Sequence, residues 1–147
     1  MSDREIIDGL IATYRDLNLR VRPQSEERLR LGGSQGAVRD VITRLRDEEL
    51  VFSQTIKDTI AGLPVAADHP DDAPVLGTES ENDTTATILA QFGTARESTL
   101  AMLRALPAQE WDARAADGPS LRERASQRLV SDRAYMERVV ALLGSPA

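Results

Sequence analysis

The chain contains no cysteine, and this absence excludes disulfide bonds, thiolate metal sites and cysteine nucleophiles. It has a single histidine, His69, so neither a set of converging imidazole ligands nor a Ser-His-acid triad is expected. Aromatic residues make up only 3% of the chain, so the core must be built from aliphatic side chains, which favours packed helices over a β-sandwich. No apolar run approaches the roughly 18 residues that a membrane-spanning helix needs.

The charge balance is acidic, with a net charge of -6 over 147 residues. An acidic surface repels phosphate backbones, so binding to nucleic acid is not expected. The N-terminal residues Met1–Glu5 are charged and have no apolar segment after them of the kind found in signal peptides. We therefore expect a protein of the cytoplasm that binds neither membranes nor nucleic acids.

Apolar residues recur every three or four positions in four segments. This spacing predicts amphipathic helices at residues 3–19, 35–61, 83–106 and 121–143. Gly62 ends the second helix, Pro107 ends the third, and Ser120-Leu-Arg-Glu123 is a capping box that begins the fourth. No segment alternates as a strand does, so the sequence predicts one all-α domain over residues 1–147.

The link between the second and third predicted helices is the longest in the chain, from Leu63 to Ser80. A link of this length is either functional or a crossover, and a crossover lets the two helices that it joins run parallel. We therefore expect a four-helix bundle with up-down-down-up topology and a long crossover between helices 2 and 3.

Three segments carry a resemblance to a known family: Val38-Arg-Asp-Val-Ile-Thr-Arg-Leu45, Ala95-Arg-Glu-Ser-Thr-Leu-Ala-Met-Leu-Arg-Ala-Leu106 and Ser131-Asp-Arg-Ala-Tyr135. They resemble the helices of DinB-like four-helix bundles. The resemblance implies the topology just described and a divalent metal held by one His of the second helix and a His-x-x-x-His pair of the fourth. The family includes mycothiol-dependent maleylpyruvate isomerases and bacillithiol transferases.

The positions that match these histidines are Arg44, Ser131 and Tyr135. A guanidinium has no lone pair to give to a metal, and neutral hydroxyl groups are weak ligands for zinc or nickel. The family's Trp-Ser before the second helix is also replaced here, by Gly36-Ala37. We therefore expect no metal and no other cofactor, and the standard activity of the family is disfavoured.

Charged residues nevertheless occur on the apolar stripes of three predicted helices, namely Glu49, Arg96 and Asp132. These side chains are expected to meet inside the bundle near the former metal site. The candidate pocket there comprises Arg44, Glu48, Glu49, Arg96, Ser131, Asp132 and Tyr135. Three interpretations remain open: a pocket for a small molecule, a structural network of ion pairs, and long side chains that extend from the stripe edge to water.

His69 lies among acidic residues in the long link, in Ala67-Asp-His-Pro-Asp-Asp72. One imidazole with several acids is a loose metal site at best, and a solvated loop with a turn-forming proline is the plainer interpretation. The glycine-rich segment 31–36 lacks the Lys-Ser/Thr of a phosphate-binding loop and follows no strand.

Two functional hypotheses follow. The first is a non-catalytic DinB-like bundle that binds a small molecule or another protein, with a homodimer formed through apolar residues off the main stripes such as Leu50, Val51 and Leu100. The second is a metal-independent enzyme of the DinB superfamily, a transferase or isomerase that binds a small thiol or a related acid through Arg44 and Tyr135.

Overall fold

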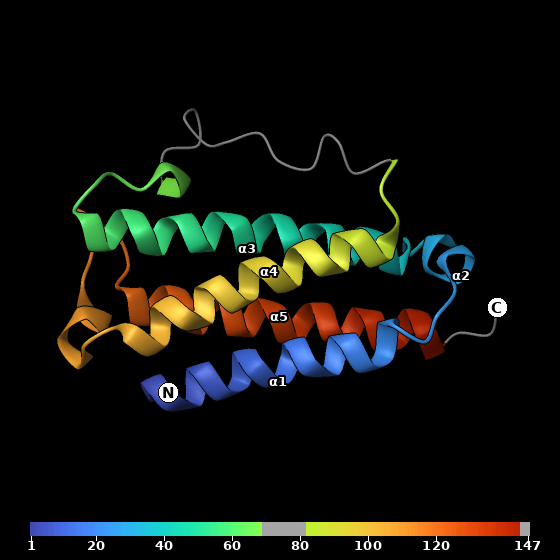
Figure 1. The fold of residues 1–147 in the computed structure, drawn as a ribbon, viewed down its shortest axis with the longest axis horizontal. Coiled ribbons are helices and arrows are strands. Elements are labelled where there is room, and N and C mark those ends of the chain that lie inside the picture. The colour runs from blue at the N-terminus through green and yellow to red at the C-terminus, as the bar shows by residue number, and fades with distance from the viewer. Residues whose placement is uncertain (69–81, 145–147) are drawn as a thin grey trace.

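Four long helices dominate a computed structural model of the chain, which describes residues 1–68 and 82–144. In chain order the elements are α1 (Asp3–Val21), α2 (Glu26–Arg30), α3 (Val38–Ala61), the 3-10 turn η1 (Ala66–Asp68), α4 (Thr85–Ala105), the 3-10 turn η4 (Ala108–Asp112) and α5 (Leu121–Gly144) (Figure 1). These described residues contain no β-strand, only two isolated bridges. The all-α prediction is confirmed, and each predicted helix begins and ends within about three residues of an observed one.

Side chains cap the first turns of three long helices, because the first N–H groups of a helix have no partner within it. The capping bonds are Glu5 N to Ser2 Oγ at 3.2 Å, Thr87 N to Thr84 Oγ1 at 3.1 Å and Glu123 N to Ser120 Oγ at 3.1 Å. At α3 the Asp40 carboxylate instead accepts from the N–H of Ala37 at 3.3 Å. Gly62 ends α3 with a φ of 71°, a left-handed conformation that glycine adopts without strain.

Contacts between the helices show their relative directions. The α3–α4 pairs are Arg39 with Thr85, Arg46 with Gln91 and Glu49 with Arg96. Both numbers rise together along this series, so α3 and α4 run in the same direction. The α1–α5 pairs, Asp3 with Arg122 and Thr13 with Asp132, show the same for those two helices. Figure 1 shows α1 and α5 running opposite to α3 and α4.

The short helix α2 joins the beginnings of α3 and α4. The Glu26 carboxylate accepts the N–H of Thr85, at 3.1 and 3.0 Å for its two oxygens, and so satisfies the first turn of α4. It also accepts from Arg39 Nη1 at 3.4 Å and Arg30 Nε at 2.5 Å. Burial acts to raise the pKa of Glu26, but hydrogen bonds from Thr85 and Arg30 outweigh it and lower the pKa below its ordinary value.

The apolar core is divided into two clusters along the bundle axis. One surrounds Phe92, near the end of the bundle that holds α2, and the other surrounds Trp111 at the opposite end. Between them lie buried or half-buried polar residues from all four long helices, among them Thr13, Glu49, Arg96 and Asp132. A polar layer therefore crosses the middle of the core.

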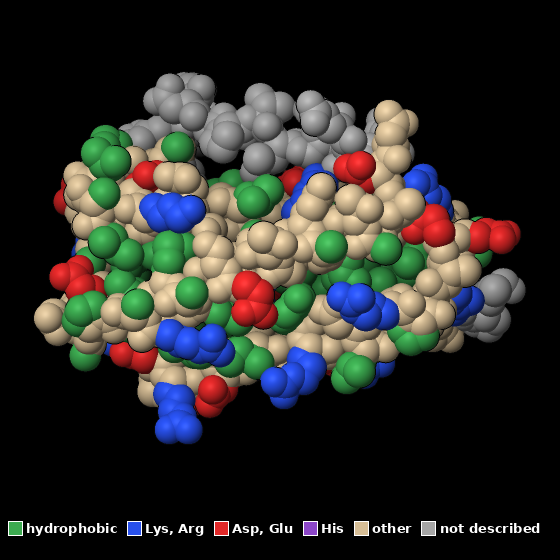
Figure 2. Space-filling model, in the orientation of Figure 1, with side chains coloured by type: hydrophobic (Ala, Val, Ile, Leu, Met, Phe, Trp, Pro, Cys, Tyr) green, Lys and Arg blue, Asp and Glu red, His purple; other side chains and the backbone are tan. Residues whose placement is uncertain are grey.

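The outer surface is mixed. On the face formed by α1 and α4, basic and acidic groups are scattered among apolar side chains (Figure 2). Leu50 is 43% exposed and is available to a partner, but Leu100 is 2% exposed because it packs in the cluster around Trp111. The expectation that Leu100 contributes to a second apolar face is therefore wrong. No helix among the described residues is long and apolar enough to cross a membrane.

The contacts of Glu26 predict a stability that depends on pH. A lowered carboxyl pKa stabilises the folded state above the ordinary value near 4.5, and this contribution is lost as the pH falls through the folded-state pKa. Glu26→Gln should therefore destabilise the protein slightly at pH 7, by under about 1 kcal/mol because the group is partly exposed. Urea unfolding from pH 7 to pH 3 should show the difference from the unmodified protein shrinking below pH 4.5. The neighbouring exposed Glu27→Gln is the control, and an equal effect there would contradict the assignment.

Candidate functional site

The centre of the polar layer is the guanidinium of Arg96, all five of whose N–H groups have acceptors. Nε and Nη2 donate to the two carboxylate oxygens of Glu49, both at 2.9 Å. Nη1 and Nη2 donate to the two oxygens of Asp132, at 2.8 and 3.1 Å. The second hydrogen of Nη1 goes to the backbone oxygen of Leu10 at 2.9 Å. Arg96 therefore ties α4 to α1, α3 and α5 at one point.

This arrangement lies entirely out of contact with solvent. Arg96 and Glu49 are 0% exposed, and Asp132 is 2% exposed. Burial acts to lower the pKa of Arg96, but the hydrogen bonds and negative charges of Glu49 and Asp132 outweigh it and raise the pKa above its ordinary value. The guanidinium carbon also lies 5.0 Å from the ring centre of Phe92, a favourable cation–π position. Arg96 is therefore a permanent cation that two anions share.

Glu49 and Asp132 carry two negative charges, and Arg96 neutralises only one of them. Asp132 accepts two further hydrogen bonds, and one of these donors is a second cation. Thr13 Oγ1 donates to Asp132 Oδ2 at 2.7 Å. Arg128, one turn earlier on α5, donates from Nε to Asp132 Oδ1 at 3.3 Å. Arg128 is itself buried, at 7% exposure. The second guanidinium restores the charge balance of the cluster.

The polar chain continues from Arg128 towards the surface. Arg128 Nη1 donates to Glu48 Oε1 at 3.2 Å, and the Tyr135 hydroxyl donates to Glu48 Oε2. The side chain of Glu48 is 41% exposed, so this carboxylate is where the network meets water. Burial and the hydrogen bond to Glu48 raise the pKa of Tyr135. Tyr135 therefore remains a neutral phenol at neutral pH.

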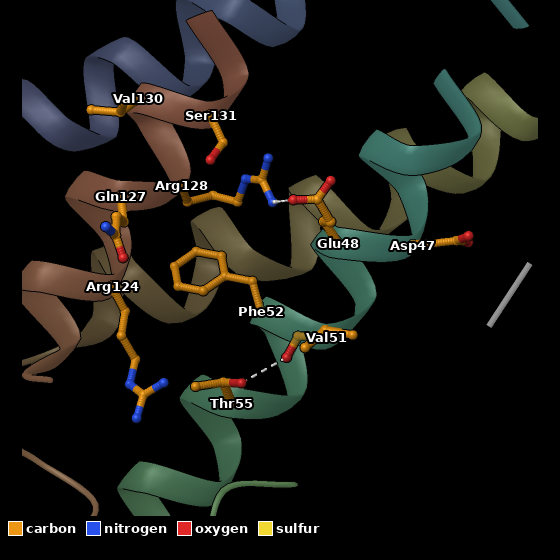
Figure 3. Close-up of a pocket in the computed structure, with 10 residues that line it drawn as sticks. All are labelled: Asp47, Glu48, Val51, Phe52, Thr55, Arg124, Gln127, Arg128, Val130 and Ser131. Atoms are coloured by element: carbon orange, nitrogen blue, oxygen red, sulfur yellow. Dashed lines mark hydrogen bonds and ion pairs between the residues drawn. The ribbon is translucent and has the colours of Figure 1, made fainter. Parts of the chain in front are cut away.

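A groove between α3 and α5 opens beside this chain. It has a volume of about 490 Å³, in the range of small-molecule sites. Its lining residues are Asp47, Glu48, Val51, Phe52, Thr55, Arg124, Gln127, Arg128, Val130 and Ser131. In Figure 3 the side chains of Arg128 and Glu48 point towards one another across the groove, and the ring of Phe52 lies between the two helices. The groove thus has the apolar ring of Phe52 between its two helices and charged side chains on both of them, acidic on α3 and basic on α5.

The structure brings together most of the residues expected at the site. Glu49, Arg96 and Asp132 meet in the core. Glu48, Ser131 and Tyr135 lie at the groove or its edge. Arg44 is the exception.

Arg44 was expected to sit among the acids, and this expectation is wrong. Its side chain is exposed, and within residues 1–68 and 82–144 it makes no ion pair. Its positive charge still acts weakly on Tyr135. The paired cations are Arg96 and Arg128 instead.

Two members of the network were not anticipated from the sequence. Thr13 lies between Leu10 and Leu17 on the apolar stripe of α1, which was a visible signal for a buried polar residue. Arg128 stands four residues before Asp132, so the two side chains share one face of α5. That spacing was the available signal for the second guanidinium.

A metal does not fit the positions that the family resemblance points to. Arg44 has no lone pair, Ser131 offers a neutral hydroxyl, and the Tyr135 hydroxyl is engaged by Glu48. Across the part of the chain that the structure describes, no cluster of three or more His, Cys or acidic side chains is arranged to hold a metal ion. His69, Asp71 and Asp72, as well as most of the predicted crossover, lie outside the described residues, whereas Asp68 is described and forms an ion pair with Arg124 at 2.6 Å.

Comparison with known proteins identifies no relative. No family model matches the chain, and neither a curated protein nor a solved structure matches it. Function is therefore inferred from the geometry of the groove and its network.

The buried cluster predicts a large difference between two arginine substitutions. Arg96→Met leaves two carboxylates in the core without their cation and should lower the free energy of unfolding by about 3–5 kcal/mol. Arg44→Ala removes an exposed side chain and should change it by less than about 0.5 kcal/mol. Urea or guanidinium unfolding monitored by circular dichroism measures both.

A triple variant separates charge imbalance from loss of packing. Arg96→Met combined with Glu49→Leu and Asp132→Leu removes the uncompensated acids and should be more stable than Arg96→Met alone. If the triple variant is less stable than the single one, the cost does not come from unpaired carboxylates. If Arg44→Ala is as damaging as Arg96→Met, the assignment of the central cation is contradicted.

Proposed function

We propose that this chain is a DinB-like bundle of the cytoplasm that has lost the metal site and binds a small organic molecule without transforming it. The observation that carries the proposal is the groove between α3 and α5, which combines the apolar ring of Phe52 with the buried guanidinium of Arg128. Ligand sites commonly pair a mainly apolar lining with a few fixed polar groups. Here the groove lies beside Ser131 and Tyr135, two of the positions that correspond to metal ligands in the family.

The directions of the helices are the first support for the proposal of a DinB-like bundle. Parallel α3 and α4, opposed by parallel α1 and α5, are the directions that an up-down-down-up bundle requires. The Arg96 layer supports the loss of metal, since it supplies fixed positive charge to acids in the middle of the bundle. Asp132 is held on three sides by Arg96, Thr13 and Arg128, so it has no role left as a metal ligand or a mobile base.

The alternative is a metal-independent enzyme that acts on a small thiol or a related acid through Arg44 and Tyr135. Activation of a thiol needs a group that accepts its proton near neutral pH. The raised pKa of Tyr135 keeps the phenol protonated, and Arg44 lies exposed outside the cluster. Both observations favour binding over catalysis.

A thermal-shift screen of small organic molecules tests the proposal, with and without added zinc or nickel. Ligands should raise the melting temperature of the unmodified protein, and the metals should not. Gln127→Trp places a large ring in the groove and should abolish the shifts. Gln54→Trp puts the same ring on an exposed α3 position outside the groove lining and should preserve them.

Two results would contradict the proposed function. One is a set of ligands whose shifts survive in Gln127→Trp, because these ligands would bind elsewhere. The other is stoichiometric zinc, nickel or iron in protein purified without added metal, as elemental analysis would detect it.

We also propose that two copies of the chain form a homodimer. Leu50 and Val51 on α3 remain accessible to a second copy, and two-fold pairs are the commonest soluble assembly. Light scattering at micromolar concentration should report about twice the chain mass of 16.1 kDa. A particle of the single-chain mass would refute the dimer and leave the groove unaffected.

A further inference from the structure

Arg128 uses only part of its hydrogen-bonding capacity. Its Nε donates to Asp132 and its Nη1 donates to Glu48, at 3.3 and 3.2 Å. Its Nη2 is buried and has no hydrogen-bond partner. The Nη1–Nη2 edge of a guanidinium matches a carboxylate in two parallel bonds, and an unpartnered buried donor is costly. Arg128 therefore makes one hydrogen bond to the carboxylate of Glu48, although its Nη1–Nη2 edge could make two to a single carboxylate.

Glu48 is the most replaceable member of the network. Its side chain is 41% exposed, whereas those of Arg128 and Asp132 are 6% and 2% exposed. Within the described residues, its carboxylate accepts hydrogen bonds from Arg128 and Tyr135. Glu48 stands at the edge of the groove, so rotation of its side chain would carry the carboxylate into water (Figure 3). Arg128 and Tyr135 would then face the groove as two donors without an acceptor.

We propose that Arg128 and Tyr135 form a receptor for the carboxylate of a small monocarboxylic acid, and that Glu48 fills this receptor when no ligand is bound. The ligand carboxylate takes the place of Glu48, and its short apolar body lies in the groove against Phe52 and Val51. This inference rests on the proposed function and names the chemical class of the ligand.

The charges of the network favour a monoanion over other ligands. Exchange of one carboxylate for another leaves the charge beside Arg128 and Asp132 unchanged. A neutral amide would leave the buried guanidinium of Arg128 without its second anion, which is unfavourable. A phosphonate brings up to two negative charges near the released Glu48 and near Asp47, which also lines the groove. Carboxylates should therefore bind more tightly than matched amides or phosphonates.

Three probes that share a benzyl group test the class of ligand: phenylacetate, phenylacetamide and benzylphosphonate. Titration calorimetry, together with NMR of the labelled protein, measures the affinity of each for the full chain. Phenylacetate should bind at least about tenfold more tightly than the other two. Equal binding of acid and amide would overturn the carboxylate receptor and leave the groove as a ligand site. Failure of all three probes to bind would overturn the carboxylate receptor. Whether the groove binds any small molecule is tested separately by the thermal-shift screen.

If Glu48 competes with the ligand, its removal should strengthen ligand binding. Glu48→Ala removes the internal competitor and should tighten phenylacetate binding by about tenfold. Glu137→Ala removes a carboxylate from an exposed position of the same helix as Arg128 and should change the affinity by less than about twofold. Unchanged or weaker binding by Glu48→Ala would contradict the displacement.

Substitution of the two donors completes the test. Tyr135→Phe removes one hydrogen bond and should weaken phenylacetate binding severalfold while phenylacetamide binding stays the same. Arg128→Lys keeps the positive charge but loses the planar pair of donors, and should weaken phenylacetate binding by about tenfold. Melting curves establish that each variant is folded, and Tyr135→Phe keeps the inference testable if Arg128→Lys is not. Full phenylacetate affinity in Tyr135→Phe, or in a folded Arg128→Lys, would overturn the receptor.

Discussion

The guanidinium of Arg96 joins the four long helices at the middle of the bundle, and the rest of the structure is built around that junction. Each of its donors has an acceptor, on α1, α3 and α5, so a shift of any one helix along its axis breaks bonds in a medium without water to replace them. Apolar side chains above and below the layer tolerate small shifts far better, because burial of apolar area is not directional. The polar layer therefore specifies the alignment of the helices, and the two apolar clusters supply most of the stabilisation.

The same junction determines how the groove is charged. Asp132 needs a second cation because it shares Arg96 with Glu49, and Arg128 provides it from one turn away. That arrangement fixes Arg128 in place, with its outer edge facing α3. The site is therefore rigid on the side of Arg128 and adjustable on the side of Glu48, which is the combination that an exchangeable carboxylate requires.

The sequence was informative about the helices because their apolar spacing and end signals agree. Gly62 and Ser120 stand where the chain leaves and enters a helix. The inner triad was also accessible, because Glu49, Arg96 and Asp132 fall on apolar stripes where an unpaired charge would be costly. What periodicity alone cannot give is the partner of each charge, since that depends on how neighbouring helices are aligned.

Arg44 illustrates that limit. It was assigned to the cluster because its position matches a metal ligand of the DinB-like bundles that the sequence resembles, yet it lies next to Leu45 on the edge of the stripe and its side chain is exposed. One residue corresponds to about 100° around a helix, so neighbouring positions can face the core and the solvent. Arg128 is the converse case: the DinB-like resemblance does not mark it, and it lies buried between Asp132, one turn later on α5, and Glu48 of α3.

Nitrogen NMR of the arginine side chains, recorded with and without phenylacetate, tests the central claim most directly. The central claim is that the Arg96 cluster is rigid, whereas the carboxylate bound to Arg128 can be exchanged for that of a ligand. The Nε–H signal of Arg96 should be strongly protected from hydrogen exchange and unchanged by the ligand, because all its acceptors lie within the protein. The Nη signals of Arg128 should shift and sharpen as a second bond forms on that edge. Rapid exchange at Arg96, or a ligand that moves the signals of Arg96 and leaves those of Arg128 unchanged, would contradict the account.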